Sequence, residues 1–442
     1  MTRSVLFIAP SAYPLGGVQT WLDTMLSGLA NRNWRPVLGL VSGQFHDAPA
    51  YLREHPWNDC VLIENPTGSR TGRIQSIARI LGKLKPDLVV GVNIADLYDA
   101  FEQMPESLQN SMKLVMTMHG LESELCNEAA RVAGICDAII CTNRLTEQVL
   151  ISIVGIQPSK VKYAPYGVAT PSNASEQQAS NQVMELLFAA RLEQSQKRVF
   201  DLPGIVHGLE TANLPYRLTI AGEGPDRSEL ENRFRPQVER GQVRFAGHVP
   251  RNILLQDFLP GSNAFLVTSE WETGPISIWE AMAHRIPVVT SAYIGSGLER
   301  ALVNDENCLM FPIGDTATAV KKIISLAQDK TVGDRLTVAA AALVKSRYSE
   351  TASQNAWNDR LSEVIDSASS IQRSLMRTSK SAEGHLNRMF GDWTANRLRQ
   401  VFGRKYSFQE PGGEWPHVSL NSRHSIGFRL SDIREVDQRC KQ

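Results

Sequence analysis

The stretch from residue 264 to 290 constrains the fold most, because strand, turn, helix and strand signals follow one another within it. The apolar run Ala264–Val267 predicts a buried strand, and Ile286–Thr290 predicts the next strand. Between them, Gly274-Pro275 predicts a turn that opens a helix, with proline where its missing N–H is tolerated. This order is typical of a parallel α/β sheet.

Two carboxylates lie in this stretch. Glu272 falls in the predicted loop between strand and helix, and Glu280 falls about two turns further on. Loops at the carboxyl ends of parallel strands line the ligand crevice of such sheets. Two acids beside a helix N-terminus suit a ligand with hydroxyls and phosphate, because carboxylates accept from hydroxyls and the helix end attracts anions. On spacing alone, a surface acid and a helix-face acid explain the two positions equally well.

Similar strand and helix signals alternate along most of the chain. They predict one Rossmann-like domain over residues 1–171 and a second over residues 183–348. The polar stretch at 171–181 lacks periodicity and predicts the linker between the two domains.

Two cations follow the first predicted strand of the second domain. Arg191 comes directly after the strand at 186–190, and Lys197 lies six residues later. At the carboxyl end of a strand, such a pair suits a diphosphate, with arginine bonding bidentately and lysine acting as a point charge. Two solvated surface cations are an equally good explanation of these positions alone.

Glycines and a histidine follow strands of the first domain. Gly16-Gly17 lies in the loop after the first predicted strand, where backbone N–H groups can approach a phosphate closely. A plain tight turn is the alternative. His119 directly follows the strand at 114–118, a position that favours a ligand site although a lone histidine is more often structural.

The order and spacing of these motifs resemble those of retaining GT-B glycosyltransferases of family 4. The resemblance covers about residues 4–364 and rests on Glu272, seven intervening residues and Glu280-Ala-Met-Ala, with Arg191 and Lys197 upstream. It implies an α/β GT-B fold, with two Rossmann-like domains facing each other across a cleft. Within it, 1–171 is the acceptor domain, 183–348 the donor domain and 349–370 a crossover helix returning to the first domain.

The resemblance also implies roles for individual residues. Catalytic roles fall to Glu272, His119, Arg191 and Lys197. Donor-binding roles fall to Gly16, Gly17, Glu223, Gly274, Pro275, Ile276 and Glu280. Of the two acids, Glu272 is expected to hold sugar hydroxyls and Glu280 the ribose hydroxyls.

The implied activity is that of a hexosyltransferase using a nucleotide-diphosphate sugar. The hexosyl group would pass with retention to a sugar hydroxyl, on a carbohydrate or lipid-linked oligosaccharide, in exopolysaccharide, capsule or lipopolysaccharide biosynthesis. No metal or other cofactor is expected, since cations and backbone dipoles can neutralise the diphosphate and the sequence has no D-x-D triplet. A GT-B sugar-nucleotide epimerase and a non-catalytic nucleotide-sugar-binding scaffold are the alternatives.

The sequence departs from the family pattern at three places where glycine is usual. Thr273 follows the first glutamate, His284-Arg285 precedes the Pro-Val-Val strand, and Cys308 lies in the closing segment. A residue other than glycine at a helix C-terminus costs about 1 kcal/mol if it must adopt a left-handed conformation.

Composition limits the partners and the compartment. Lys+Arg and Asp+Glu both number 46, so there is no global basic field for nucleic acid. No apolar run approaches the roughly 20 residues that span a bilayer, and the N-terminal run predicts a strand better than a signal peptide. The six cysteines form no C-x-x-C pair, which disfavours zinc and favours a reducing cytoplasm.

The last segment, 371–442, lies outside the resemblance and is basic. It holds 13 Lys/Arg against 7 Asp/Glu by count of the sequence, with aromatic residues between them. A short amphipathic helix is predicted near 383–402, and with it peripheral contact with the inner face of the membrane. A solvated, partly ordered extension is the alternative.

Overall fold

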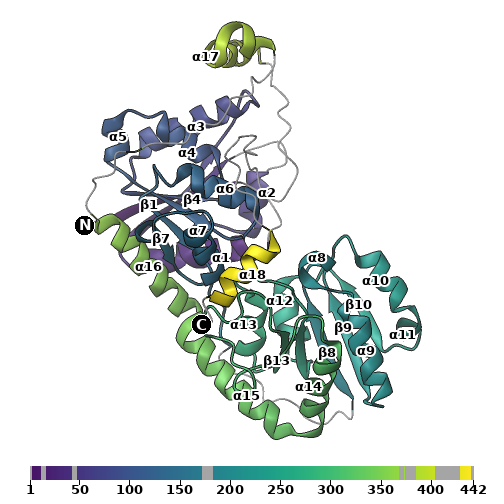
Figure 1. Cartoon of the computed structure of the whole chain (residues 1–442). Helices are drawn as coiled ribbons and strands as arrows, with labels where there is room; N and C mark the ends of the chain where they lie inside the picture. Colours follow the sequence, from purple (N-terminus) through teal and green to yellow (C-terminus); the bar gives the residue numbers. More distant parts are fainter. Residues whose placement is uncertain are drawn as a thin grey trace. The chain divides into compact units, whose positions relative to one another are not determined.

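The computed structural model describes residues 2–10, 16–41, 47–171, 183–367, 373, 385–403 and 429–439. The predicted linker from residue 172 onward and much of the predicted extension lie outside these residues. The chain divides into two compact units (Figure 1). Unit 1 comprises residues 1–164 and 354–432, and unit 2 comprises residues 165–353 and 433–442.

Unit 1 is built on a seven-stranded parallel sheet of order β3-β2-β1-β4-β5-β6-β7. Its strands are β1 (Arg3–Pro10), β2 (Trp34–Val41), β3 (Cys60–Ile63), β4 (Leu88–Val92), β5 (Lys113–Met118), β6 (Ala138–Cys141) and β7 (Val161–Tyr163). Its helices are α1 (Gly16–Ala30), α2 (Ala48–Glu54), α3 (Arg70–Leu84), α4 (Asp96–Glu102), α5 (Glu106–Asn110), α6 (Ser123–Val132), α7 (Arg144–Ser152), the 3-10 turn η1 (Pro158–Lys160) and α17 (His385–Val401).

The central strands of this sheet are buried on both faces. Residues 5–8 of β1 have no exposed surface, and all of β4 and β5 is buried. Such strands appear in the sequence as continuous apolar runs instead of an alternating pattern. The predicted stripe of α1 is buried as well, with Trp21 at 3% and Met25 at 1% exposure.

Unit 2 is built on a six-stranded parallel sheet of order β10-β9-β8-β11-β12-β13. Its strands are β8 (Met184–Ala189), β9 (Tyr216–Ala221), β10 (Val243–Gly247), β11 (Ala264–Val267), β12 (Val288–Ser291) and β13 (Leu309–Phe311). Its helices are α8 (Gln194–Lys197), α9 (Asp201–Thr211), α10 (Arg227–Arg233), α11 (Arg235–Glu239), α12 (Arg251–Ile253), α13 (Ile276–Ala283), α14 (Thr316–Gln328) and α15 (Lys330–Leu343), with π-helical turns η2 (Leu254–Phe258) and η3 (Val344–Tyr348). Two further helices, α16 (Glu350–Asp366) and α18 (Leu430–Arg439), have residues assigned to both units.

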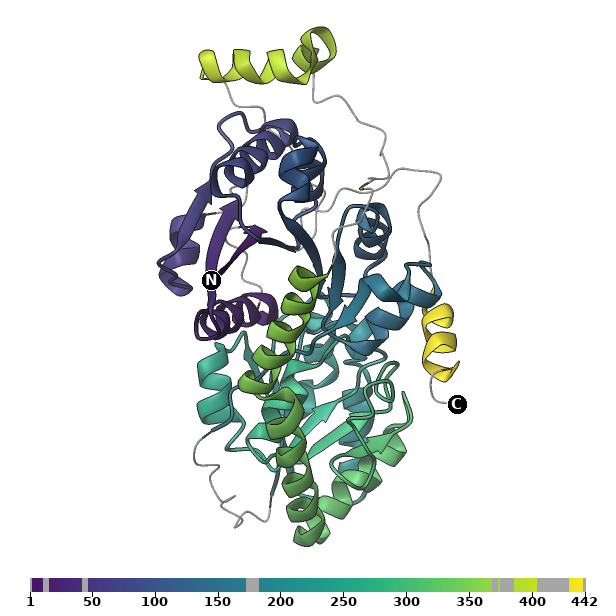
Figure 2. The same ribbon diagram turned by 90° about the vertical axis from the view of Figure 1, so that its left-hand side faces the viewer.

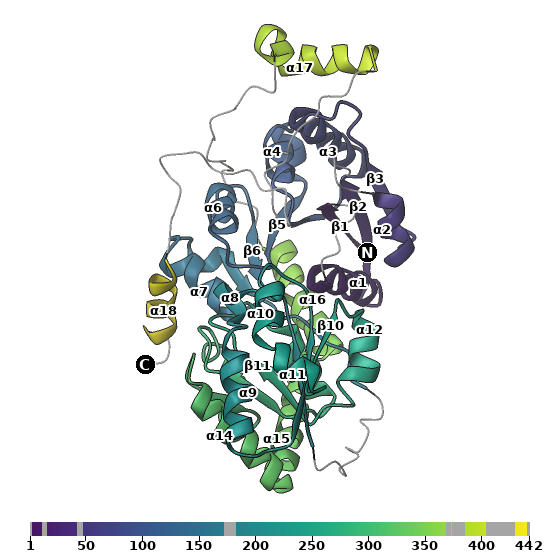
Figure 3. The same ribbon diagram turned by 90° about the vertical axis from the view of Figure 1, so that its right-hand side faces the viewer.

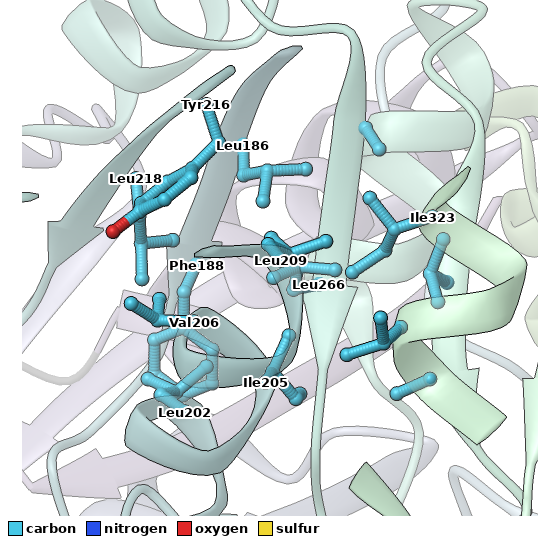
Figure 4. Packing of buried hydrophobic residues seen from close by; sticks show 14 of the residues in the cluster. Leu186, Phe188, Leu202, Ile205, Val206, Leu209, Tyr216, Leu218, Leu266 and Ile323 are labelled. Atoms are coloured by element: carbon cyan, nitrogen blue, oxygen red, sulfur yellow. The ribbon is translucent and has the colours of Figure 1, made fainter. Parts of the chain in front are cut away.

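Neighbouring residues of the unit 2 strands enter two different cores, because successive side chains of a strand point to opposite faces. Leu186 of β8 and Leu266 of β11 pack with α9 and α14, as Figure 4 shows. Figure 3 labels β11, α9 and α14. The neighbouring residues Leu187 and Phe265 pack in the other core, with α13 and α15. Helices therefore cover both faces of the sheet.

The two sheets share one topology. In each, the strand order reverses beside the first strand, between β1 and β4 in unit 1 and between β8 and β11 in unit 2. This confirms the predicted α/β class with two Rossmann-like domains. Ligands of such sheets bind outside the carboxyl ends of the strands at the point where the order reverses.

Candidate functional site

The loop of residues 268–275, between β11 and α13, is fixed by hydrogen bonds to the end of α8. The hydroxyl of Thr268 donates to the backbone oxygen of Lys197 at 2.6 Å. The backbone N–H of Glu270 donates to the backbone oxygen of Gln196 at 2.7 Å. The loops that follow β8 and β11 are thus joined at the place where the strand order of unit 2 reverses.

These loops bring Lys197 and Glu272 together. The Lys197 ammonium lies 2.8 Å from each carboxylate oxygen of Glu272, and the Ser269 hydroxyl donates to Glu272 Oε1 at 2.5 Å. The side chains of Lys197 and Glu272 are 18% and 8% exposed. Two residues that the sequence placed at separate strand ends therefore form one largely buried ion pair.

Arg191 and Glu223 follow β8 and β9 and are more open. The Arg191 side chain is 57% exposed, and its Nε lies 3.3 Å from the Glu193 carboxylate. Glu223 pairs with Arg227, whose hydrogen bond lowers the pKa of the Glu223 carboxyl. Arg191 thus pairs with Glu193, while Lys197 pairs with Glu272.

The loop that carries Glu223 lies close to the one that carries Arg191. Gly222 has φ 136°, and a Cβ at this residue would come within 1.9 Å of the backbone oxygen of Ala190. The N–H of Leu192 donates to the backbone oxygen of Glu223 at 2.8 Å. Glycine at 222 is what allows this close approach.

The first residue of α13, Ile276, lies four residues beyond Glu272. Gly274 takes φ 88°, and Pro275 precedes the first helical residue, Ile276. All three are partly exposed. The first N–H groups of a helix have no acceptor inside the helix, so this end favours an anion.

Glu280 lies on α13 and is paired. Its exposure is 5%, and burial raises the pKa of its carboxyl. The Nε of Arg251 donates to Glu280 Oε1 at 2.6 Å, while Arg251 Nη2 is buried with no hydrogen-bond partner in the described structure. Arg251 carries no motif that marks it in the sequence, because nothing there links α12 to the middle of α13.

A second acid of the same loop is held by two arginines. Glu270 pairs with Arg198 at 3.0 Å and with Arg434 of α18. Asp437, on the same helix, accepts a hydrogen bond from the Gly295 N–H at 3.1 Å. Residues 433–439, predicted as part of a separate extension, thus belong to unit 2 and hold the loops after β11 and β12.

In unit 1, His119 is buried and neutral. Burial lowers the pKa of its imidazole to about 3, and the ring lies 4.6 Å from the ring of Trp21. Its Nε2 lies 3.0 Å from the Thr117 hydroxyl, which itself donates to the Gly91 backbone oxygen at 2.9 Å. Thr117 must then accept, so Nε2 of His119 carries the proton.

Other polar groups lie near the reversal point of unit 1. Gly16 and Gly17 are the first two residues of α1 instead of loop residues, and the loop of residues 11–15 lies outside the described structure. Asn93 follows β4 directly and is 5% exposed, yet its side-chain nitrogen and oxygen have no hydrogen-bond partner within the described ranges. Its place after a strand is the only sequence signal that marks it.

The described residues contain no group of three or more His, Cys, Asp or Glu side chains that could hold a metal ion. None of their helices is both long and apolar enough to cross a membrane.

Comparison with known proteins decides the fold type. The family model "Glycosyltransferase Family 4" matches residues 15–171, and "Glycosyl transferases group 1" matches residues 184–329. The Anabaena protein HepE, in a structure with UDP and glucose, superposes with a TM-score of 0.62 at 16% identity, over 81% of this chain and 99% of that one. The chain has a GT-B fold.

Curated relatives match parts of this GT-B chain. The lipopolysaccharide core biosynthesis glycosyltransferase LpsD of Rhizobium meliloti is 25% identical over 156 residues, 35% of this chain and 44% of LpsD. A glycogen synthase of Mycobacterium tuberculosis is 32% identical over 143 residues, 32% of this chain and 34% of the synthase. The chain thus spans less than half the length of either relative.

Proposed function

We propose that this protein is a glycosyltransferase that moves a hexosyl group from a nucleotide-diphosphate sugar to a sugar hydroxyl, with retention of anomeric configuration. The observation that carries the proposal is the Lys197–Glu272 pair, held at the reversal point of the unit 2 sheet. Both halves of the chain match glycosyltransferase family models, which also supports glycosyl transfer as the function.

The donor that fits best is a UDP sugar. HepE, which shares the fold, was solved with UDP and glucose. In our proposal the diphosphate meets the Lys197 ammonium, the more exposed Arg191 and the first N–H groups of α13. The ribose hydroxyls bind Glu280, and the buried Nη2 of Arg251 gives this region one more donor.

The reaction breaks the bond between C1 of the hexosyl group and the β-phosphate oxygen. The acceptor oxygen bonds to C1 on the same face, and the acceptor proton passes to the departing phosphate oxygen. Negative charge builds on the diphosphate in the transition state, where preorganised cations and helix N–H groups stabilise it most. Because these groups already supply positive potential, we propose that transfer needs no metal.

Unit 1 takes the acceptor in this proposal. Asn93 supplies a donor and an acceptor that are buried and unpaired, which suits hydroxyl groups of a sugar. His119, neutral and oriented by Thr117, is proposed to contact the transferred sugar. We place the reaction in polysaccharide or glycoconjugate biosynthesis, on the cytoplasmic side of a membrane that carries a lipid-linked acceptor.

A nucleotide-release assay tests the proposal. The full chain is incubated with UDP-, GDP- and ADP-hexoses, with and without mono- and oligosaccharide acceptors, in EDTA. Acceptor-dependent release of UDP is expected. Release of nucleotide and free sugar without acceptor would indicate an epimerase, binding without turnover would indicate a scaffold, and loss of activity in EDTA that manganese restores would contradict the metal-free mechanism.

A further inference from the structure

Helix α17 of unit 1 has an unusual distribution of polar and apolar side chains. A surface helix normally buries its apolar face and exposes its polar one. In α17 the polar residues Asn387, Asn396 and Arg399 are 5% exposed or less. The large apolar side chains face solvent instead.

The buried polar side chains of α17 form hydrogen bonds with residues at the start of α3. The hydroxyl of Ser69, the N-cap of α3, donates to Asn396 Oδ1 at 2.7 Å. Asn396 Nδ2 donates to the Thr71 hydroxyl at 2.8 Å, and Arg399 Nη1 donates to Asn396 Oδ1 at 3.0 Å. These hydrogen bonds fix the orientation of the helix. In this orientation its apolar side chains face solvent.

Most of the exposed large hydrophobic side chains of the described chain lie on α17 or directly after it. Ten large hydrophobic residues are exposed, and six of them lie within residues 386–402. These six are Leu386 (41%), Met389 (73%), Phe390 (49%), Trp393 (64%), Val401 (72%) and Phe402 (70%). A cluster of exposed apolar side chains of this kind indicates an interaction surface.

The helix bends in the middle of this surface. Gly391 has φ 74° and ψ 165°, which interrupts the helical conformation, and Figure 2 shows the resulting bend. Met389 and Phe390 lie just before the bend and Trp393 just after it. Large apolar side chains are thus exposed on both pieces of the helix.

Arginines accompany the apolar side chains. Arg388 and Arg397 are exposed, and the guanidinium of Arg397 lies 5.2 Å from the Trp393 ring centre. The sequence of residues 385–403 holds three arginines and one acidic residue. This combination of exposed aromatic, aliphatic and cationic groups suits the boundary between lipid headgroups and acyl chains.

We propose that α17 docks unit 1 on the surface of an anionic lipid bilayer. Its apolar side chains enter the headgroup boundary, and Arg388 and Arg397 meet lipid phosphates. A twofold contact between copies of the chain is disfavoured, because it would place the arginines of both copies in one interface. The proposal rests on α17 alone and does not depend on the proposed glycosyl transfer.

Sedimentation with vesicles tests the proposal with the full chain and no nucleotide. Vesicles of phosphatidylcholine with and without phosphatidylglycerol are compared with the wild type and with Met389→Ser/Phe390→Ser/Trp393→Ser. We expect the wild type to bind the anionic vesicles and the triple variant to bind at least about tenfold more weakly, because three insertion sites are lost. Arg388→Gln/Arg397→Gln should bind both kinds of vesicle equally weakly, since the electrostatic attraction is removed.

Val338→Ser is the matched control, since Val338 is 61% exposed on α15 in unit 2 and should not matter for binding. Point substitutions are preferable to truncation, because truncation would also remove Arg434 from Glu270. Equal binding by wild type and triple variant, or no binding by the wild type, overturns the proposal. So does self-association that the triple variant loses while vesicles are ignored, which would mark α17 as a contact between copies.

Discussion

The Lys197 ammonium contacts both carboxylate oxygens of Glu272 at 2.8 Å, and the Ser269 hydroxyl contacts one of them. Together these contacts use three of about four acceptor positions of the carboxylate. The geometry of the pair therefore leaves Glu272 capacity for a further hydroxyl donor.

Lys197→Ala should lower both turnover and stability. We expect turnover to fall roughly ten- to a thousandfold, because a cation near the departing diphosphate is lost. The free energy of unfolding should fall by about 1–3 kcal/mol, because Glu272 is left buried without its partner. Rates of UDP release and urea unfolding measure the two effects.

Two further variants separate these effects. Adding Glu272→Gln to Lys197→Ala should restore much of the stability and none of the turnover. Arg191→Ala, at a side chain that is 57% exposed, should lower turnover while leaving unfolding unchanged within about 0.5 kcal/mol. Wild-type turnover in both single variants would contradict the phosphate assignment.

Glu280→Gln and Arg251→Ala should weaken UDP binding more than they weaken turnover at saturating donor. Each removes a charged hydrogen-bonding group that we assign to the nucleotide, so the dissociation constant should rise about tenfold or more. Glu272→Gln should show the reverse, with turnover lost and UDP affinity nearly retained. Calorimetric titration with UDP decides this, and equal losses of affinity in all three variants would refute the division of roles.

His119 should make unit 1 sensitive to acid. The pKa of its imidazole is about 3 in the fold and about 6.5 in the unfolded chain, so below pH 6.5 the unfolded state binds a proton that the folded state does not. The free energy of unfolding should therefore decrease as the pH is lowered from 6.5 towards 3. The decrease should be up to about 1.4 kcal/mol per pH unit. His119→Gln should flatten this part of the pH profile of urea unfolding, and an unchanged slope would show that His119 is not the buried titrating group.

Arg285→Gly should stabilise unit 2. Arg285 follows the end of α13 with φ 58°, the left-handed conformation that glycine adopts at little cost. The free energy of unfolding, measured by heat or urea, should rise by about 0.5–1 kcal/mol. Arg240→Gly is the control, since Arg240 caps α11 with φ −82° and should gain nothing. A loss of stability in Arg285→Gly would mean that its side chain contributes more than its backbone costs.

The sequence predicted the strands well because most of them are buried on both faces. Runs such as those of β1, β4 and β11 are apolar throughout, so they stand out without any knowledge of the fold. The strand β13 was not predicted, since its three residues, Leu309–Phe311, are too few for a periodic signal.

The candidate site was predictable only where a strand end marks it. Lys197, Glu272 and His119 follow strands closely, and their positions could be inferred before their contacts were known. Arg251 and Arg434 could not, because each reaches its glutamate across a long sequence separation from a helix with no motif. Such pairings depend on how helices pack, which periodicity does not encode.

Donor use by the wild-type full chain tests the central claim most directly. UDP, GDP and ADP should be titrated calorimetrically, and UDP release from a panel of UDP-hexoses should be measured with and without sugar acceptors. We predict UDP binding at one site, weakened in Glu280→Gln and unchanged in the surface control Arg439→Ala, together with UDP release that requires an acceptor. Failure to bind any of the three nucleotides, with no release from any of their sugars, would contradict the account.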